Sequence, residues 1–286
     1  MLKNGLLKNS FALLIICLIA LAYLEQTRHV VVQRGGGDGA SSLPHLSTVE
    51  PLAQNKQQRG FITSQFGMSH FNTDELNAIV GAPDYQAGND SFYLTDPKHR
   101  IINYVAVGIN QKPYFANSYL VGFVPFQTDR IWVPLATLSM RKRYVLDHIQ
   151  YGPSMSDVWQ NSEQAYYYGH GDCEDHALLL ADWLIGLDYD ARVVIGEIPA
   201  GGHAWVVVFL DGKEYVLEAT DKRRPSSLND FMLASLATAY RPKLQFNRTS
   251  FWENTGSTLT VRYGDDKWQL HSRFKRESPA PLTLVE

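Results

Sequence analysis

The chain has 286 residues, which suits one large domain or two small ones and leaves room for a substantial core. Hydrophobic residues make up 45% of the chain, close to the average of globular proteins, so most of it is expected to fold. The formal net charge of -3 provides no electrostatic attraction for a nucleic acid and argues against such a partner.

The N-terminus carries an unbroken apolar run, Phe11–Leu24, which Lys3 and Lys8 precede. The run is somewhat shorter than the ~20 apolar residues of a typical spanning helix. We predict that residues 1–24 form an uncleaved signal-anchor, with the lysines inside the cell and the rest of the chain outside it. A cleavable signal peptide is the alternative, because the segment from Ala20 to Ala22 loosely resembles a small-residue cleavage site.

Residues 25–59 are predicted to form a flexible linker, because Gly35–Ser42 is rich in glycine and serine and polar residues follow it. The chain looks globular from about Phe61, and residues 60–140 form an N-terminal part of the globular region to which no fold is assigned. Periodicity and end signals predict a helix over 73–83, a strand over 100–109, a helix over 134–153 and a short helix over 161–168.

The clearest helix signal lies in the stretch GHGDCEDHALLLADWL, Gly169–Leu184, and the helix is predicted to run to about Leu187. Asp172 is the expected N-cap, with Asp175 in the third helical position as in a capping box. Cys173 is the only cysteine outside the N-terminal apolar run. It would lie in the first turn, on the packed face that the later alanines and leucines share.

Three strands are predicted after this helix, over 191–198, 203–210 and 213–220, and an Asp211-Gly212 turn joins the last two. A second hairpin is predicted from strands over 258–263 and 267–274, and residues 277–286 are expected to be a tail. Helices followed by mostly antiparallel strands indicate an α+β fold. The domain that contains these elements is placed at 141–276.

The hairpin brings together the residue types that nucleophilic catalysis requires. With Asp211-Gly212 as the turn, Trp205 lies opposite Glu218, so His203 and Glu218 become diagonal neighbours. A carboxylate can orient a histidine and stabilise its charged form, and Asp221 is the alternative acid. If the helix packs on this sheet, the Cys173 thiol meets His203. The helix N-terminus then favours the thiolate, and its free backbone N–H groups could bind an oxyanion.

The segments GHGDCEDHALLLADWL, GGHAWVVVF and YVLEAT resemble the transglutaminase-like superfamily, in particular its bacterial cysteine peptidase branch. The resemblance covers about Val145 to Asp221. It implies a papain-like fold with the catalytic helix on an antiparallel sheet, Cys173 as nucleophile and His203 as base. Glu218 stands where the family usually has aspartate.

The resemblance further implies a calcium ion beside the cysteine, with Asp172 and Glu174 at the matching positions, and no required organic cofactor. Closely spaced carboxylates suit calcium, and a cation would reduce the repulsion that they exert on a thiolate. The expected protein is therefore a thiol hydrolase on the bacterial inner membrane, facing the periplasm, or a secreted periplasmic form after signal cleavage. Its expected substrates are peptide or isopeptide bonds of envelope proteins.

Three alternatives remain open at this point. The acyl-enzyme could pass its acyl group to an amine, which would make the protein a true protein-glutamine transglutaminase. The fold could instead serve as a non-catalytic binding or scaffold module. A zinc site is the third alternative, built from Cys173, His170, His176 and His203, but their spacing matches no standard zinc pattern.

Overall fold

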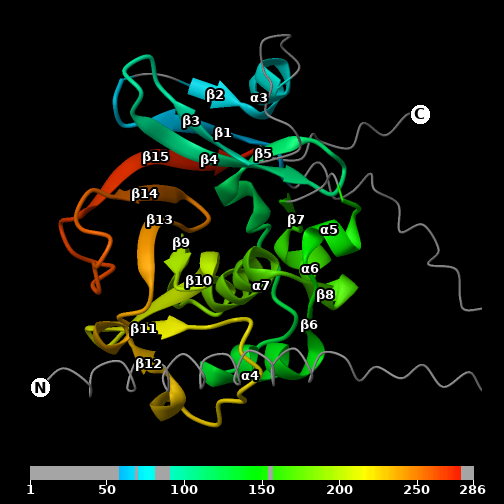
Figure 1. The fold of residues 1–286 in the computed structure, drawn as a ribbon, viewed down its shortest axis with the longest axis vertical. Helices are drawn as coiled ribbons and strands as arrows, with labels where there is room; N and C mark the ends of the chain where they lie inside the picture. The colour runs from blue at the N-terminus through cyan, green and yellow to red at the C-terminus, as the bar shows by residue number, and fades with distance from the viewer. Residues whose placement is uncertain (1–57, 68–69, 81–90, 154–156, 278–286) are drawn as a thin grey trace, which may run out of the picture. The chain divides into compact units, whose positions relative to one another are not determined.

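The computed structural model describes residues 58–67, 70–80, 91–153 and 157–277. Within them, the largest element is a nine-stranded antiparallel sheet (Figure 1). In spatial order its strands are β12 (Met232–Leu233), β11 (Lys213–Leu217), β10 (Gly201–Leu210), β9 (Asp190–Ile198), β13 (Arg241–Phe246), β14 (Ser250–Asn254), β15 (Trp268–Arg276), β1 (Gly60–Ser64) and β2 (His70–Asn72).

Smaller sheets and helices complete the described region. Strands β3 (Phe92–Thr95), β4 (Ile101–Gly108), β5 (Pro113–Phe115) and β7 (Val158–Trp159) form a second sheet, and β6 (Arg143–Tyr144) pairs with β8 (His170–Gly171). The α-helices are α3 (Thr73–Val80), α4 (Trp132–Arg141), α5 (Asp147–Gln150), α6 (Ser162–Tyr168) and α7 (Cys173–Gly186). Three short 3-10 helices are η1 (Ala116–Tyr119), η2 (Leu228–Asp230) and η3 (Ala234–Leu236).

The helix α7 is the centre of the main core and packs against β9, β10, α4 and α6. Every residue from Glu174 to Leu184 is buried, so the helix is enclosed on all sides. The sequence predicted a single packed face, and this was wrong. The reason is that α4 and α6 cover the side of α7 that the sheet does not.

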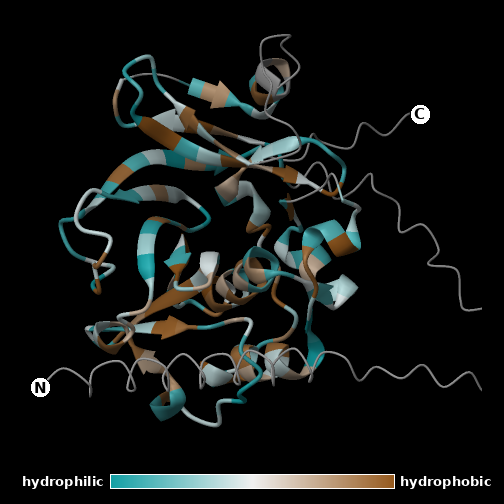
Figure 2. Ribbon diagram, viewed as in Figure 1, coloured by the Kyte–Doolittle hydropathy of each residue, from teal (hydrophilic) through white to brown (hydrophobic). Residues whose placement is uncertain are grey.

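The sheet is buried on both faces at β10, as its run of valines indicates. Successive side chains of a strand alternate between faces, so Val206 and Val208 join the core around α7. Trp205 and Val207 join a second core on the other face. Figure 2 shows hydrophobic residues concentrated along β10 and β11. The strand that carries His203 is therefore anchored from both sides.

Two predicted elements differ from the structure. The helix predicted over 134–153 ends at Arg141, because the next residues leave it to pair with His170–Gly171 as β6. The second hairpin has a different composition, since 258–263 form no strand and β15 pairs with β14 and β1.

The remaining terminal predictions lie almost wholly outside the described residues. These are the signal-anchor or signal peptide at 1–24, the linker at 25–59 apart from its last two residues, and the tail beyond Glu277. No helix in the described part of the chain is long and apolar enough to cross a membrane. Strand β1 pairs with β15, so residues from both sides of the predicted boundary at 140 and 141 share one sheet.

Candidate active site

Cys173 is the first residue of α7, as predicted, and Asp172 holds the N-cap position. The predicted capping box is absent, because the Asp172 side chain makes no capping hydrogen bond. Asp175 instead accepts a hydrogen bond of 2.7 Å from the backbone N–H of Gln160, so it binds the loop before α6. The first N–H groups of α7 thus keep no side-chain cap beside the thiol.

The hairpin of β10 and β11 has the predicted turn and register. Asp211 and Gly212 both have positive φ angles, of 50° and 72°, as a two-residue hairpin turn requires. Val206 pairs with Leu217, the last residue of β11. Glu218 therefore follows the ladder directly, where its side chain is free to turn toward His203.

His203 and Glu218 are directly hydrogen-bonded to each other. The His203 Nε2 lies 2.7 Å from Glu218 Oε2. An ionised carboxylate is an acceptor only, so Nε2 carries the proton and Nδ1 is the nitrogen left for another partner. Cys173 and His203 line the same cleft, and the thiol interacts with the His203 side chain strongly enough to raise the pKa of that histidine. The structure thus brings the three predicted residues together.

Glu218 is fixed by residues that the sequence did not single out. Its Oε2 also accepts a hydrogen bond of 2.9 Å from the Tyr240 hydroxyl, and its Oε1 accepts from the Thr220 backbone N–H at 3.0 Å and hydroxyl at 2.6 Å. Asp221, the alternative acid, instead pairs with Arg223. Thr220 could have been predicted as a partner, because it lies only two residues after Glu218, but no sequence signal indicated that Tyr240 lies near this carboxylate.

The electrostatics favour the ion pair of histidine and carboxylate. Burial favours the neutral imidazole, but hydrogen bonds and charges from Cys173 and Glu218 outweigh burial and raise the pKa of His203 to about 10. Burial also disfavours an ionised Glu218, yet the hydrogen bonds from His203 and Thr220 lower the pKa of its carboxyl below the usual value. His203 is therefore a charged partner for the thiol at neutral pH.

The thiol also has an acidic neighbour, because Cys173 Sγ donates to Glu174 Oε2 over 3.3 Å. The thiol opens into a cleft of about 330 Å³, which gives a substrate access to it. The cleft is lined by Tyr104, Asp157, Trp159, Asp172, Cys173, Glu174, Ile195, Gly196, Gly202, His203 and Ala204.

A cluster of five carboxylates surrounds the start of α7, and we call it the acidic cluster: Asp147, Asp157, Asp172, Glu174 and Asp175. Overlapping groups of these side chains have oxygen atoms within 4.8 Å of one another. Four of them each have a buried oxygen with no hydrogen-bond partner: Asp147 Oδ1, Asp172 Oδ1, Glu174 Oε1 and Asp175 Oδ2. Buried oxygens without partners are costly, so the donor chemistry of this cluster fits a bound cation.

The crowding of these carboxylates also shifts their pKa values. Burial and then the charge of Asp172 raise the pKa of Asp147 to about 7 and raise the pKa values of Glu174 and Asp175 well above the ordinary range. The buried Lys142 supplies one positive charge to Asp175 and Asp172, but burial lowers its own pKa to about 8. Of the acidic cluster, the sequence predicted Asp172 and Glu174 as metal ligands and missed the other three. Asp147 and Asp157 lie in separate elements, and Asp175 had been read as a cap.

The histidines of the zinc alternative are not assembled. Among the described residues, no group of candidate metal ligands includes a histidine. His170 Nδ1 lies 2.9 Å from Gln150 Oε1, and His176 Nδ1 lies 3.3 Å from the Ala219 carbonyl.

Comparison with known families adds an independent observation. Residues 157–273 match the family model described as the CEP76 peptidase-like domain, a span that includes Cys173, His203 and Glu218. This part of the chain is therefore similar to a peptidase-like domain. No curated protein matches the chain.

Several solved structures are distantly similar to the chain. Calcium-bound LapG of Legionella pneumophila shares 16% identity at a TM-score of 0.36, covering 50% of this chain and 76% of that one. A second structure of the same protein shares 18% identity at a TM-score of 0.35, covering 49% and 75%. A putative cysteine protease from Cytophaga hutchinsonii shares 16% at a TM-score of 0.27, covering 51% of each chain.

Proposed function

We propose that the protein is a membrane-tethered thiol hydrolase that cleaves peptide or isopeptide amide bonds through Cys173, His203 and Glu218. The observation that carries the proposal is the chain of contacts from the thiol through His203 to Glu218, which ends in the 2.7 Å hydrogen bond. Nucleophile, base and orienting acid in this order form the arrangement of a thiol hydrolase.

The proposed reaction has an acylation step and a hydrolysis step. In the active pair the proton of Cys173 resides on His203, which is then an imidazolium, and the thiolate sulfur attacks the amide carbonyl carbon. The tetrahedral intermediate collapses as the C–N bond breaks, and the imidazolium gives its proton to the leaving amine. The product is an acyl-thioester on Cys173. Water, deprotonated by His203, then attacks the thioester and releases the acid and the free thiol.

Glu218 acts throughout as the positioning acid. Its four hydrogen bonds fix the carboxylate, so His203 is held with Nε2–H toward Glu218 and Nδ1 toward the thiol. The start of α7 contributes in a second way, since its free N–H groups carry partial positive charge. They stabilise both the thiolate and the oxyanion that forms on the attacked carbonyl.

Calcium is the ion that the acidic cluster fits, because carboxylate oxygens are its preferred ligands. Asp172 and Glu174, joined by Asp147, Asp157 and Asp175, would hold it. When bound, calcium supplies positive charge that neutralises carboxylates crowded beside the thiol. Glu174 ligating through its carboxylate would no longer accept a hydrogen bond from Cys173, which leaves His203 as the polar partner of the sulfur.

The cellular setting extends the proposal from the N-terminal pattern. Lys3, Lys8 and the apolar run Phe11–Leu24 support an anchor in the bacterial inner membrane, with the peptidase domain in the periplasm. Protein or peptide substrates of the cell envelope follow from that position, since the tether limits the reach of the cleft.

The test is the rate at which iodoacetamide alkylates Cys173, measured against pH in the full-length protein. We expect wild-type alkylation near neutral pH to exceed that of a model thiol, and His203→Ala to remove the excess. The exposed His148→Ala is the matched control and should leave the rate unchanged. A wild-type rate equal to the model thiol, unaffected by His203→Ala, would contradict the proposal and favour a scaffold role.

A product assay separates hydrolysis from acyl transfer, because both share the acyl-enzyme. Cleavage of a quenched fluorescent peptide library, with and without an added primary amine, is followed by mass spectrometry. Free acids in the presence of amine support a hydrolase. Amide products in their place would identify a transglutaminase instead.

A further inference from the structure

Two further cavities lie outside the cleft, and both border the segment Arg224–Pro225. The first, of about 390 Å³, is bounded by Leu217 and Glu218 at the end of β11. The second, of about 400 Å³, is bounded by α4. Both are lined by Arg224 and Pro225, so the two cavities are adjacent, one beside Glu218 and the other along α4, and we call the two together the groove.

The floor of the second cavity is the outward face of α4. It is made of Trp132, Val133, Ala136, Thr137 and Met140, whose spacing puts them on one side of a helix. The Thr137 hydroxyl donates to the carbonyl of Val133, so this residue presents its methyl group. Met140 is 57% exposed, so much of its apolar side chain is open to a ligand. The floor can therefore receive a bulky apolar side chain.

The charged residues that line this second cavity are both arginines, Arg130 and Arg224. Both are exposed, and within the described residues neither forms an ion pair with an acidic side chain. The three acids of the first cavity all have partners. Glu218 accepts from His203, Asp221 pairs with Arg223, and Asp230 accepts from the N–H groups of Ser226 and Ser227. Two arginines over an apolar floor thus lack a negative partner.

We propose that this groove is a docking site for an acidic segment of the protein substrate, in which carboxylates alternate with bulky apolar side chains. Arg130 and Arg224 would bind the carboxylates through their planar guanidinium groups, and the α4 face would take the apolar side chains. A substrate segment that lay along the groove would reach Glu218, which is hydrogen-bonded to His203. The assignment of the ligand as substrate rests on the proposed function, whereas the binding itself does not.

The test is binding of a fluorescein-labelled peptide of about ten residues that alternates glutamate and leucine, followed by anisotropy. The protein is the full chain with Cys173→Ser, so that no cleavage occurs. We expect Arg130→Glu and Arg224→Glu each to weaken binding about tenfold, and added salt to weaken it further. Met140→Ser should also weaken binding, because it removes apolar surface from the floor.

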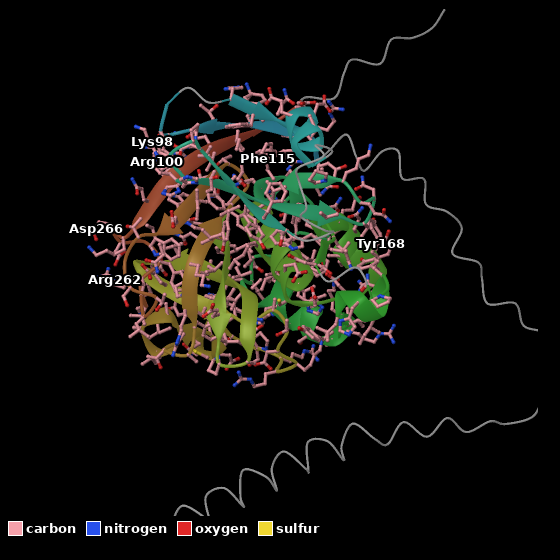
Figure 3. The ribbon with its side chains drawn as sticks, turned by 45° about the horizontal axis from the view of Figure 1, so that its top comes forward. Lys98, Arg100, Phe115, Tyr168, Arg262 and Asp266 are labelled. Carbon is pink, nitrogen blue, oxygen red and sulfur yellow. The ribbon has the colours of Figure 1, made fainter. Side chains whose placement is uncertain are left out.

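The control variant is Arg262→Glu, which makes the same charge change at an exposed arginine that lines neither cavity. Figure 3 shows Arg262 at the periphery beside Asp266. Equal weakening by Arg262→Glu would overturn the proposal, as would equal binding of a peptide with lysine in place of glutamate. Binding to anionic lipid vesicles without binding to the peptide would also overturn it. Because the assay needs no hydrolysis, an inactive protein that binds the peptide would refute the proposed function alone.

Discussion

Removing the charge of Glu218 is the most direct perturbation of the proposed triad. Glu218→Gln keeps the length of the side chain, but an amide cannot satisfy both His203 and Thr220 as a carboxylate does. The pKa of His203 stands at about 10 against an ordinary 6.5, and Cys173 and Glu218 share the cause. The His203 side chain is only 9% exposed, so solvent screens little of this interaction.

If Glu218 contributes about half of the rise, the pKa of His203 should fall by about two in Glu218→Gln. This corresponds to about 3 kcal/mol of lost stabilisation of the imidazolium, and to a loss of about a hundredfold in the rate of amide hydrolysis. The titration midpoint of His203 can be followed by NMR with ring-labelled histidine, beside the hydrolysis rate.

The sign of the pH effect follows from the raised pKa. In the wild type, stabilisation from the His203 pair is fully present below pH 6.5 and is lost as the pH rises through about 10. In Glu218→Gln, it should be lost about two pH units earlier. Glu197→Gln, a surface carboxylate on the neighbouring strand β9, is the control. A His203 midpoint unchanged by Glu218→Gln would refute the reasoning.

Three further predictions concern stability. Without calcium, the free energy of unfolding should fall as the pH rises from about 4 to about 7, because folded Asp147, with a pKa of about 7, keeps a proton that unfolded Asp147 loses. Thermal melts with calcium should lose this pH dependence. Identical melts in calcium and in EGTA would exclude the cation site. Asp182→Asn should cost about 3 kcal/mol in urea unfolding, since it leaves the Arg248 guanidinium without its buried anion; a cost under about 1 kcal/mol would contradict this. Gly196→Ala should lower the free energy of unfolding by about 2 kcal/mol, because the new Cβ would lie 2.2 Å from the Arg241 carbonyl oxygen. The control is Gly202→Ala, whose Cβ would meet nothing within 4 Å. Equal urea midpoints for the two variants would refute this prediction.

The part of the site that the sequence predicted well is local. The Asp211-Gly212 turn sets the register of β10 and β11, and that register alone brings Glu218 near His203. Likewise, the start of a helix at Cys173 follows from the pattern around it. Both inferences need only neighbouring residues and the fixed geometry of a hairpin and a helix.

The part that the sequence missed depends on contacts between distant segments. Tyr240 reaches Glu218 from a segment 22 residues away, and no periodicity encodes that contact. Asp147 lies in a segment that looked like a continuous helix, until the pairing of β6 with β8 overrode the helical periodicity. Strand β1 joins the sheet by pairing with β15 at the opposite end of the described chain. Such pairings are decided by tertiary packing, which a single sequence does not state.

Cys173 lies between two polar side chains, Glu174 and His203, that compete for its sulfur. In the absence of a cation, Glu174 Oε2 accepts from the thiol at 3.3 Å, and the high pKa of Glu174 shows how poorly its charge is tolerated there. His203, already protonated at neutral pH by its pairing with Glu218, offers the opposite charge on the other side. Neutralising the acidic cluster removes the competing acceptor and leaves the imidazolium as the partner of the sulfur. The same carboxylates that burden the thiol would therefore make its reactivity depend on calcium.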